Sequence, residues 1–297
     1  MGTAVVSSKW CSGEGRGPRY RTWGMAKNRL PRWAGRGLRV LILTYCGVIF
    51  MAATFADRLI FVPPPPSYDA ETGGLLRLTT ARGDTVAAVY LPAPEASLTV
   101  LFAHGNAEDL GDLLPHLERY RALGISVMAF DYPGYGLSTG RPSEDGAYAA
   151  ADAAYHHLVG QLGVDSTRIV AHGRSLGGGV MVDLAARRPL GGLVIESSFV
   201  SAYRVMTRLA LLPVDQFRNL KKMPDVHVPV LIVHGMADEV IAPWHGRRLA
   251  DAVPRDRRQT LWVEGAGHND LVQVAGDSYW IALRSYLDSI EHTLRGQ

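Results

Sequence analysis

Val170-Ala171-His172-Gly173-Arg174-Ser175-Leu176-Gly177-Gly178-Gly179 joins a short apolar run to a helical pattern through Gly-x-Ser-x-Gly. Small residues at Gly173 and Gly177 permit a sharp strand-to-helix turn, since a side chain at either position would collide with neighbouring backbone. Such a turn exposes Ser175 and places the backbone N–H of Leu176 at a helix start, where unpaired donors favour a developing negative charge. The alternative is an ordinary helix N-terminus that Ser175 caps.

Short β-rich runs alternate with helical patterns through most of the chain. This alternation predicts right-handed crossovers and a mostly parallel sheet with helices on both faces, in which sites form at the carboxyl ends of the strands. The expected strands are 75–80, 85–91, 98–102, 125–130, 169–171, 193–195, 230–233 and 260–263, and the expected helices are 108–123, 143–162, 176–187, 245–253 and 270–294.

Charge is distributed unevenly along the 297 residues. Residues 1–39 contain nine Lys and Arg but a single acidic residue, so this tail carries +8. The whole chain carries +3, which leaves −5 for the remainder. A basic tail is typical of nucleic-acid binding, but the acidic balance of the remainder argues against a nucleic-acid partner.

An uncharged stretch of seventeen residues, 40–56, follows the basic tail directly. Its length is at the short end for a membrane span, and the Arg cluster before it predicts that this side stays in the cytoplasm. A cleaved signal peptide and a buried helix are the alternatives. Met25 is an alternative start, because the residues before it have no periodic apolar pattern.

The sequence predicts four parts, namely a basic tail (1–39), a transmembrane anchor (40–56), a Pro-rich linker (57–74) and a catalytic domain (75–297). Four consecutive prolines make the linker either an extended spacer or an arm packed on the domain. Both cysteines lie before residue 57, so the domain has no thiol nucleophile and no Cys-based zinc site. We expect no metal and no cofactor.

Two further residues complete a pattern of nucleophilic catalysis with Ser175. His268 follows the run 260–263 in a Gly-containing loop, and Asp238 follows the run 230–233. A serine needs a base to take its proton, and the base needs a carboxylate to fix its tautomer. Glu196, at the end of another expected strand, is the reserve candidate for the acid.

The order Ser175, Asp238, His268 resembles that of the α/β-hydrolases over roughly residues 75–294. His104-Gly105-Asn106-Ala107 is similar to the oxyanion loop of that family, and Asp131-Tyr132-Pro133-Gly134-Tyr135-Gly136 is similar to a second family turn. The resemblance implies an α/β-hydrolase fold, with the backbone N–H groups of Asn106 (or Ala107) and Leu176 as the oxyanion hole. Within the family, the chain is similar to the membrane-anchored group of acyl-protein depalmitoylases and bacterial serine aminopeptidase-like proteins. Those depalmitoylases carry an N-terminal cysteine cluster that this chain lacks, so depalmitoylation does not transfer.

A small cap is expected at about 199–223, where the family inserts one. Tyr203, Met206 and Leu209 are its candidate pocket residues for an acyl chain. The alternative is an amphipathic helix packed on the sheet.

Taken together, the residues and the resemblance predict a serine hydrolase of carboxylic esters or thioesters, acting on a small acyl ester or lipid-like substrate. A serine peptidase, with Glu196 or Asp215 binding the substrate amine, and a non-catalytic binding protein are the alternatives. The positive residues predict a cytoplasmic N-terminus and an extracytoplasmic domain, periplasmic or extracellular.

Overall fold

The computed structural model describes residues 32–206 and 215–296. The chain divides into two compact units, Met1–Cys46 and Gly47–Gln297, and the boundary falls inside the first helix, α1 (Arg32–Ile60). Among the described residues, no single helix meets the length and hydropathy expected of a membrane span. Two consecutive stretches of α1, Arg36–Ala52 and Thr54–Ile60, meet it only when taken together, with a bend of 54° between them.

Eight strands form one sheet in the order β1-β2-β4-β3-β5-β6-β7-β8. The pairs β1–β2 and β2–β4 are antiparallel, and the remaining neighbours are parallel, which confirms the predicted mostly parallel sheet. The strands are β1 (Leu75–Thr79), β2 (Thr85–Leu91), β3 (Thr99–Ala103), β4 (Ser126–Phe130), β5 (Ile169–Arg174), β6 (Gly192–Glu196), β7 (Val230–Gly235) and β8 (Arg258–Val263).

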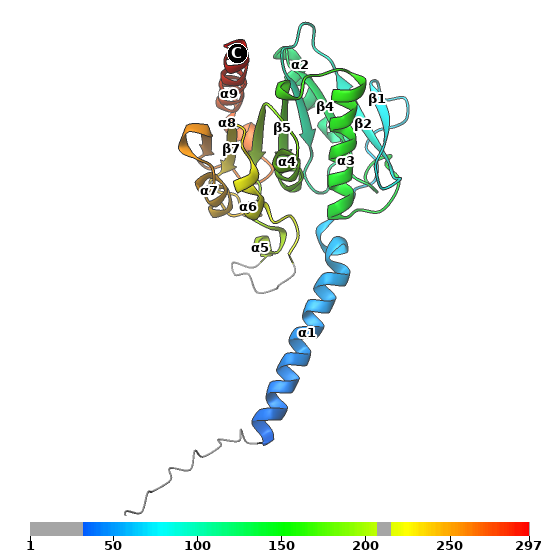
Figure 1. Cartoon of the computed structure of the whole chain (residues 1–297), viewed down its shortest axis with the longest axis vertical. Helices are drawn as coiled ribbons and strands as arrows, with labels where there is room; N and C mark the ends of the chain where they lie inside the picture. The colour runs from blue at the N-terminus through cyan, green and yellow to red at the C-terminus, as the bar shows by residue number, and fades with distance from the viewer. Residues whose placement is uncertain (1–31, 207–214, 297) are drawn as a thin grey trace, which may run out of the picture. The chain divides into compact units, whose positions relative to one another are not determined.

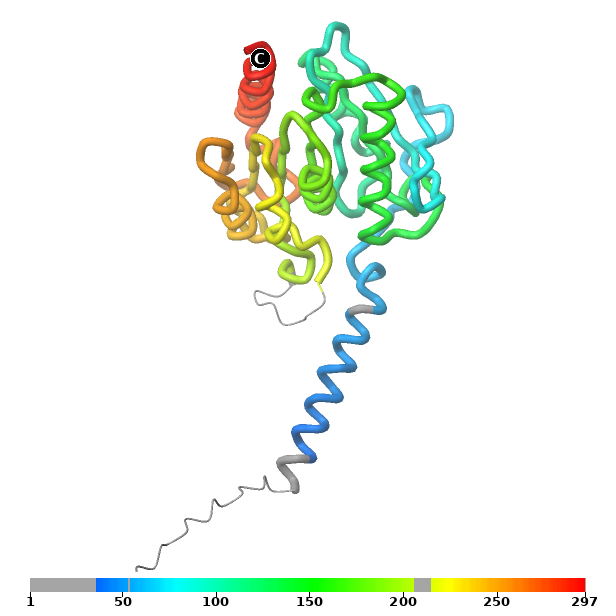
Figure 2. Tube along the Cα trace, in the orientation of Figure 1, coloured from blue at the N-terminus to red at the C-terminus, as the bar shows by residue number. Residues whose placement is uncertain are grey.

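Helices cover both faces of this sheet, because its central strands are apolar on both sides. In β3, Leu101 and Ala103 belong to one buried cluster, whereas Val100 and Phe102 belong to the other. The first cluster packs under α3 (Glu144–His156), α4 (Leu176–Arg187) and α7 (Trp244–Asp251), and the second under α2 (Leu110–Ala122) and α9 (Asp277–Arg295). Figure 1 shows α3 and α4 in front of the strands. In Figure 2 the β1–β2 segment (cyan) lies beside α3 (green), which contacts β1.

Two predicted helices are interrupted. The expected helix 270–294 is α8 (Leu271–Ala275) followed by α9, because Gly276 between them has φ +54°, outside the helical region. The expected helix 143–162 is α3 followed by a π-helical turn, His157–Gln161.

The side-chain oxygens of Ser143 and Asp109 accept backbone N–H groups at the starts of α3 and α2, as helix caps do.

The expected cap region, 199–223, is described only in part. It contains the short helices α5 (Ala202–Met206) and α6 (Asn219–Lys222), and the 3₁₀ turn Met223–Asp225 follows. The remaining short 3₁₀ turns are Ser166–Arg168 and Arg255–Arg257.

The Pro-rich segment is packed on the domain. Phe61 is buried, the Ser67 N–H donates to Asp109 Oδ2 at 2.7 Å, and the Tyr68 hydroxyl donates to Asp131 Oδ2 at 2.5 Å. Of the two possibilities that the prolines allowed, this arrangement corresponds to the packed arm.

Candidate active site

Ser175 lies between the end of β5 and the first residue of α4. Its φ of +53° is strained for a residue with a side chain, and such strain at a strand-to-helix turn is typical of a catalytic nucleophile. The turn does not expose Ser175 to the extent expected, since the residue is only 8% exposed. A Cβ at Gly173 would collide with the carbonyl group of Gly177, and one at Gly177 would collide with the carbonyl oxygen of Ala103. The turn therefore needs glycine at both positions, for the reason that the sequence predicts.

The structure brings Ser175, His268 and Asp238 together from three loops. His268 Nε2 lies 3.0 Å from Ser175 Oγ, and His268 Nδ1 lies 2.8 Å from Asp238 Oδ2. Each loop follows the carboxyl end of a parallel strand, β5, β7 or β8, which is why residues up to 93 positions apart meet at one edge. All three side chains are at most about one-tenth exposed.

Asp238 is held as an anion by its own loop. Its Oδ1 accepts the backbone N–H groups of Val240 and Ile241 at 2.9 and 2.7 Å. Burial raises the pKa of the Asp238 carboxyl, but the hydrogen bonds from His268 and Ile241 outweigh it, so the pKa lies below its ordinary value. This carboxylate can fix the orientation of His268 and stabilise the imidazolium.

The two backbone N–H groups that the family resemblance assigns to the oxyanion hole are free to bind an anionic oxygen. Neither the N–H of Leu176, at the start of α4, nor that of Asn106 has an acceptor within residues 32–206 and 215–296. The side-chain amide of Asn106 is not a further donor to this oxygen, because its Nδ2 already donates to the Ile60 carbonyl oxygen at 2.5 Å.

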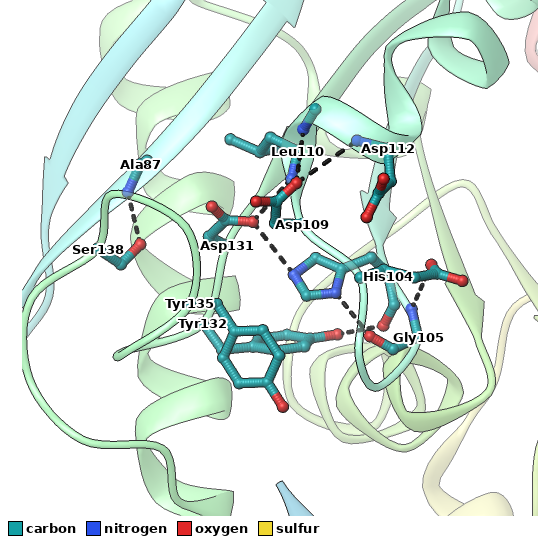
Figure 3. A network of polar contacts seen from close by, with 12 residues as sticks. Ala87, His104, Gly105, Asp109, Leu110, Asp112, Asp131, Tyr132, Tyr135 and Ser138 are labelled. Carbon is teal, nitrogen blue, oxygen red and sulfur yellow. Dashed lines mark hydrogen bonds and ion pairs between the residues drawn. The ribbon is translucent and has the colours of Figure 1, made fainter. Parts of the chain in front are cut away.

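A buried polar network supports the loop that contains Asn106 (Figure 3). Asp131 Oδ1 accepts the N–H of Leu110 at 3.0 Å and lies 3.3 Å from His104 Nε2. The Tyr132 hydroxyl donates to the His104 carbonyl oxygen at 2.6 Å. These contacts hold the loop from β3 to α2 at both of its ends.

Glu196, the reserve candidate for the acid, is occupied elsewhere. Its Oε2 accepts the Tyr279 hydroxyl at 2.6 Å and lies 3.2 Å from His172 Nε2, and its Oε1 lies 3.6 Å from Arg174 Nε. Burial raises the pKa of Glu196, but interactions with His172 and Arg174 outweigh it and lower the pKa to about 2. Asp238 is the carboxylate that contacts His268.

The Glu196 network predicts a pH-dependent loss of stability in Glu196→Gln. Because the folded pKa of about 2 lies below an unfolded value of about 4.3, the wild type has this stabilisation above pH ~4.3 and loses it as the pH falls towards ~2. This difference in pKa corresponds to a stabilisation of the folded state by roughly 3 kcal/mol. Urea unfolding should therefore show a large destabilisation of Glu196→Gln at pH 7 that shrinks at pH 3. Glu71→Gln, at an exposed carboxylate, is the control. If Glu196→Gln were destabilised equally at pH 7 and pH 3, the Glu196 carboxylate would not be stabilised as an anion in the folded protein.

A cavity of about 620 Å³ opens beside His268. Its walls come from α2, α8, α9 and the ends of β5 and β6. The side chains that line it combine apolar surface with polar groups: Phe102, Leu113, Pro115, Leu271, Val272 and Trp280, together with Glu108, Asp112, His116, Arg119, Arg174, Glu196, His268, Asn269 and Gln273.

Of the three candidate pocket residues of the cap, Tyr203 alone has a side chain in the described part of the structure. Tyr203 does not line the cavity beside His268, and its hydroxyl donates to the Ala52 carbonyl oxygen at 2.9 Å. Met206 ends α5, but its side chain lies outside the described part of the structure, as does Leu209. Whether this region holds an acyl chain stays a prediction.

Arg174, the residue directly before Ser175, has a structural role that the sequence pattern does not reveal. Arg174 forms ion pairs with Glu108 and Glu196 and donates to Asn269 Oδ1 at 3.2 Å. It thus ties the loop after β3 to the loop that carries His268. Its position inside the Gly-x-Ser-x-Gly motif was the available signal. Among the described residues, no group of three or more His, Cys, Asp or Glu side chains is arranged to hold a metal ion.

Comparisons with known proteins all point to one family. The profile described as "Alpha/beta hydrolase family" matches residues 100–221. Alpha/beta hydrolase domain-containing protein aho-3 of Caenorhabditis elegans is 35% identical, over 82% of this chain and 80% of its own. Alpha/beta hydrolase domain-containing protein 17B of Xenopus tropicalis is 34% identical, over 73% of this chain and 85% of its own.

Solved structures share the fold at lower identity. An esterase of Pyrococcus furiosus superposes with a TM-score of 0.64 at 19% identity, covering 77% of this chain and 99% of the esterase. A monoacylglycerol lipase of Paleococcus ferrophilus superposes with a TM-score of 0.56 at 20% identity, covering 69% and 99%. These likenesses concern the fold alone.

Proposed function

The chain belongs to the alpha/beta hydrolase family, and from this premise we propose that it is a serine hydrolase that cleaves carboxylic esters or thioesters. The observation that carries the proposal is the hydrogen-bonded chain from Ser175 Oγ through His268 to Asp238, with distances of 3.0 and 2.8 Å. Activation of a serine needs a base within this reach and a carboxylate behind the base.

In the proposed reaction, Ser175 Oγ attacks the carbonyl carbon while His268 Nε2 takes its proton. The tetrahedral intermediate carries its negative charge on the former carbonyl oxygen, which the N–H groups of Leu176 and Asn106 bind. His268 then returns the proton to the leaving alcohol or thiol as the bond to the acyl carbon breaks. Water hydrolyses the acyl-enzyme by the same steps in reverse order and releases the acid.

We assign the leaving group to the cavity beside His268. The base must deliver a proton to the departing oxygen or sulfur, and His268 is the triad residue that lines this space. A volume of about 620 Å³ is within the usual range for a small-molecule site.

Ester chemistry is better supported than peptidase chemistry. A peptidase of the aminopeptidase type needs a free carboxylate for the substrate amine, and Glu196 and Asp215 were the candidates. Glu196 is already bound by Tyr279, His172 and Arg174, and Asp215 Oδ1 accepts the backbone N–H of Tyr203 at 3.0 Å.

The proposal extends to a membrane anchor at 40–56, between the basic tail 1–39 and the Pro-rich segment 57–74, with the catalytic domain at 75–297. Leu41, Leu43 and Phe50 of α1 are each more than two-thirds exposed, and such apolar surface is stabilised by a lipid environment. Because positive residues tend to stay on the cytoplasmic side of a span, we propose a cytoplasmic N-terminus and a catalytic domain on the extracytoplasmic side, periplasmic or extracellular.

Labelling with a fluorophosphonate probe tests the proposed chemistry. The probe reacts covalently with an activated serine, so we expect a stoichiometric adduct on Ser175 by mass spectrometry of the full-length protein in detergent. Ser175→Ala should give none, and Ser198→Ala, which removes another buried serine near the turn, should still react. An unlabelled wild type would favour the non-catalytic binding protein.

A further inference from the structure

The end of α1 is hydrogen-bonded to the loop that carries Asn106. Asn106 Nδ2 donates to the Ile60 carbonyl oxygen at 2.5 Å, and Asn106 Oδ1 accepts the Val62 N–H at 2.9 Å. One side-chain amide thus satisfies an acceptor and a donor that the helix end leaves without helical partners. The Tyr135 hydroxyl donates to the same Oδ1 at 2.7 Å and accepts the Val62 N–H at 3.1 Å.

Apolar packing fixes this junction. Phe61, only 4% exposed, lies between the rings of Tyr135 and Phe217, with centroid distances of 6.4 and 5.9 Å. Gln216, beside Phe217, donates to Asp57 Oδ1 at 2.9 Å. The end of α1 is therefore bound to the cap region as well as to the loop.

The same segment holds the loop at a second point. Ser67 donates its N–H to the carboxylate of Asp109, and its hydroxyl also contacts this carboxylate, which caps α2. Ser67 packs so closely on Gly111 that a Cβ there would collide with it. Residues 60–68, which we name the junction segment, thus form hydrogen bonds with the loop 104–109 at two points, Asn106 and Asp109.

Between Asn106 and Asp109, the loop has a strained backbone. Ala107 has φ +57°, which a residue with a side chain adopts only when its surroundings enforce it. Asn106 Oδ1 accepts the Ala107 N–H at 3.2 Å, so the amide bound by the junction segment also restrains this conformation. The backbone N–H of Asn106, immediately before the strained residue, belongs to the proposed oxyanion hole.

We propose that the Asn106 side chain is a positioning residue through which the junction segment fixes the oxyanion-binding N–H. The proposal rests on the serine-hydrolase function above. On this view α1 is more than a tether, because catalysis requires its end to be docked on the domain. The effect acts on the transition state, where the oxygen is negative, and only weakly on substrate binding.

Four variants of the full-length protein in detergent test this role. Asn106→Ala removes the side-chain hydrogen bonds to Ile60 and Val62 but keeps the backbone N–H. Asn106→Asp keeps the side-chain acceptor and loses the donor to the Ile60 carbonyl oxygen. Tyr135→Phe removes one hydroxyl, and Tyr155→Phe is the matched control, since its hydroxyl donates to the Pro189 carbonyl oxygen, away from Asn106 and the junction segment. For each, kcat is expressed per active site titrated with a fluorophosphonate, so that misfolded molecules do not count.

We expect kcat per site to fall by about 10- to 100-fold in Asn106→Ala, a part of the ~100- to 1,000-fold loss typical of a missing oxyanion donor. KM should stay within about 3-fold of wild type. Asn106→Asp should be intermediate, Tyr135→Phe should lose severalfold, and Tyr155→Phe should match wild type. The pH profile should not move, because His268 and Asp238 are untouched.

A kcat per site in Asn106→Ala within about 3-fold of wild type would overturn the positioning role while leaving the serine-hydrolase function intact. If Asn106→Ala does not fold, equal kcat values for Tyr135→Phe and Tyr155→Phe would overturn it instead. A wild type that neither turns over esters nor reacts at Ser175 would instead overturn the proposed function, and this inference with it.

Discussion

His268→Ala should hydrolyse esters at least about 1,000-fold more slowly than wild type, because removal of the base leaves Ser175 as an unactivated hydroxyl. Within the described residues, the hydrogen-bond partners of the His268 ring are Ser175 Oγ and Asp238 Oδ2. The imidazole is the link between them, so its loss affects kcat directly. The measurement is kcat/KM on a p-nitrophenyl ester.

The fold should survive this change. His268 lies in a loop and not in the core, and the Gly267 N–H bond to Asp270 Oδ1, which shapes the loop, remains. Circular dichroism and the urea midpoint provide the control. Near wild-type activity in a folded His268→Ala would remove this residue from the mechanism.

Asp238→Asn should be nearly as damaging, by roughly 1,000-fold or more. Oδ1 accepts two backbone N–H groups, from Val240 and Ile241, so the amide oxygen of an asparagine must stay on that side. Its NH₂ group then faces His268 Nδ1 and forces the ring into the tautomer with the proton on Nε2. That tautomer cannot accept the proton of Ser175.

The matched comparison is Glu196→Gln, which removes a buried carboxylate that does not contact His268. We expect its kcat/KM to stay within about 10-fold of wild type at pH 7, provided that the fraction folded is measured alongside. If Glu196→Gln were the more damaging of the two, the acid of the triad would be Glu196.

The parts that the sequence predicts well are those with local signals. A Gly-x-Ser-x-Gly between an apolar run and a helical pattern predicts the turn at Ser175, and the two later strand ends predict that Asp238 and His268 share its edge. The alternation of runs predicts the parallel sheet. The break at Gly276 is missed because α8 and α9 together have a continuous helical period, which does not reveal a positive φ.

The junction segment shows why the rest was beyond sequence reasoning. Val62 meets Asn106 across 44 positions and Tyr135 across 73, and no periodicity relates them. The prolines indicate a stiff segment but not where it docks. The side-chain role of Asn106 is hidden for the same reason, since the family resemblance concerns only its backbone N–H.

Serine-dependent ester hydrolysis can be measured with p-nitrophenyl esters of two to sixteen acyl carbons, using the full-length protein with Ser175→Ala alongside. We predict turnover of at least part of the series by the wild type and none above background by Ser175→Ala, with the chain-length profile reporting the size of the acyl site. Hydrolysis that persists in Ser175→Ala, or no hydrolysis of any ester by the wild type, would contradict a serine esterase.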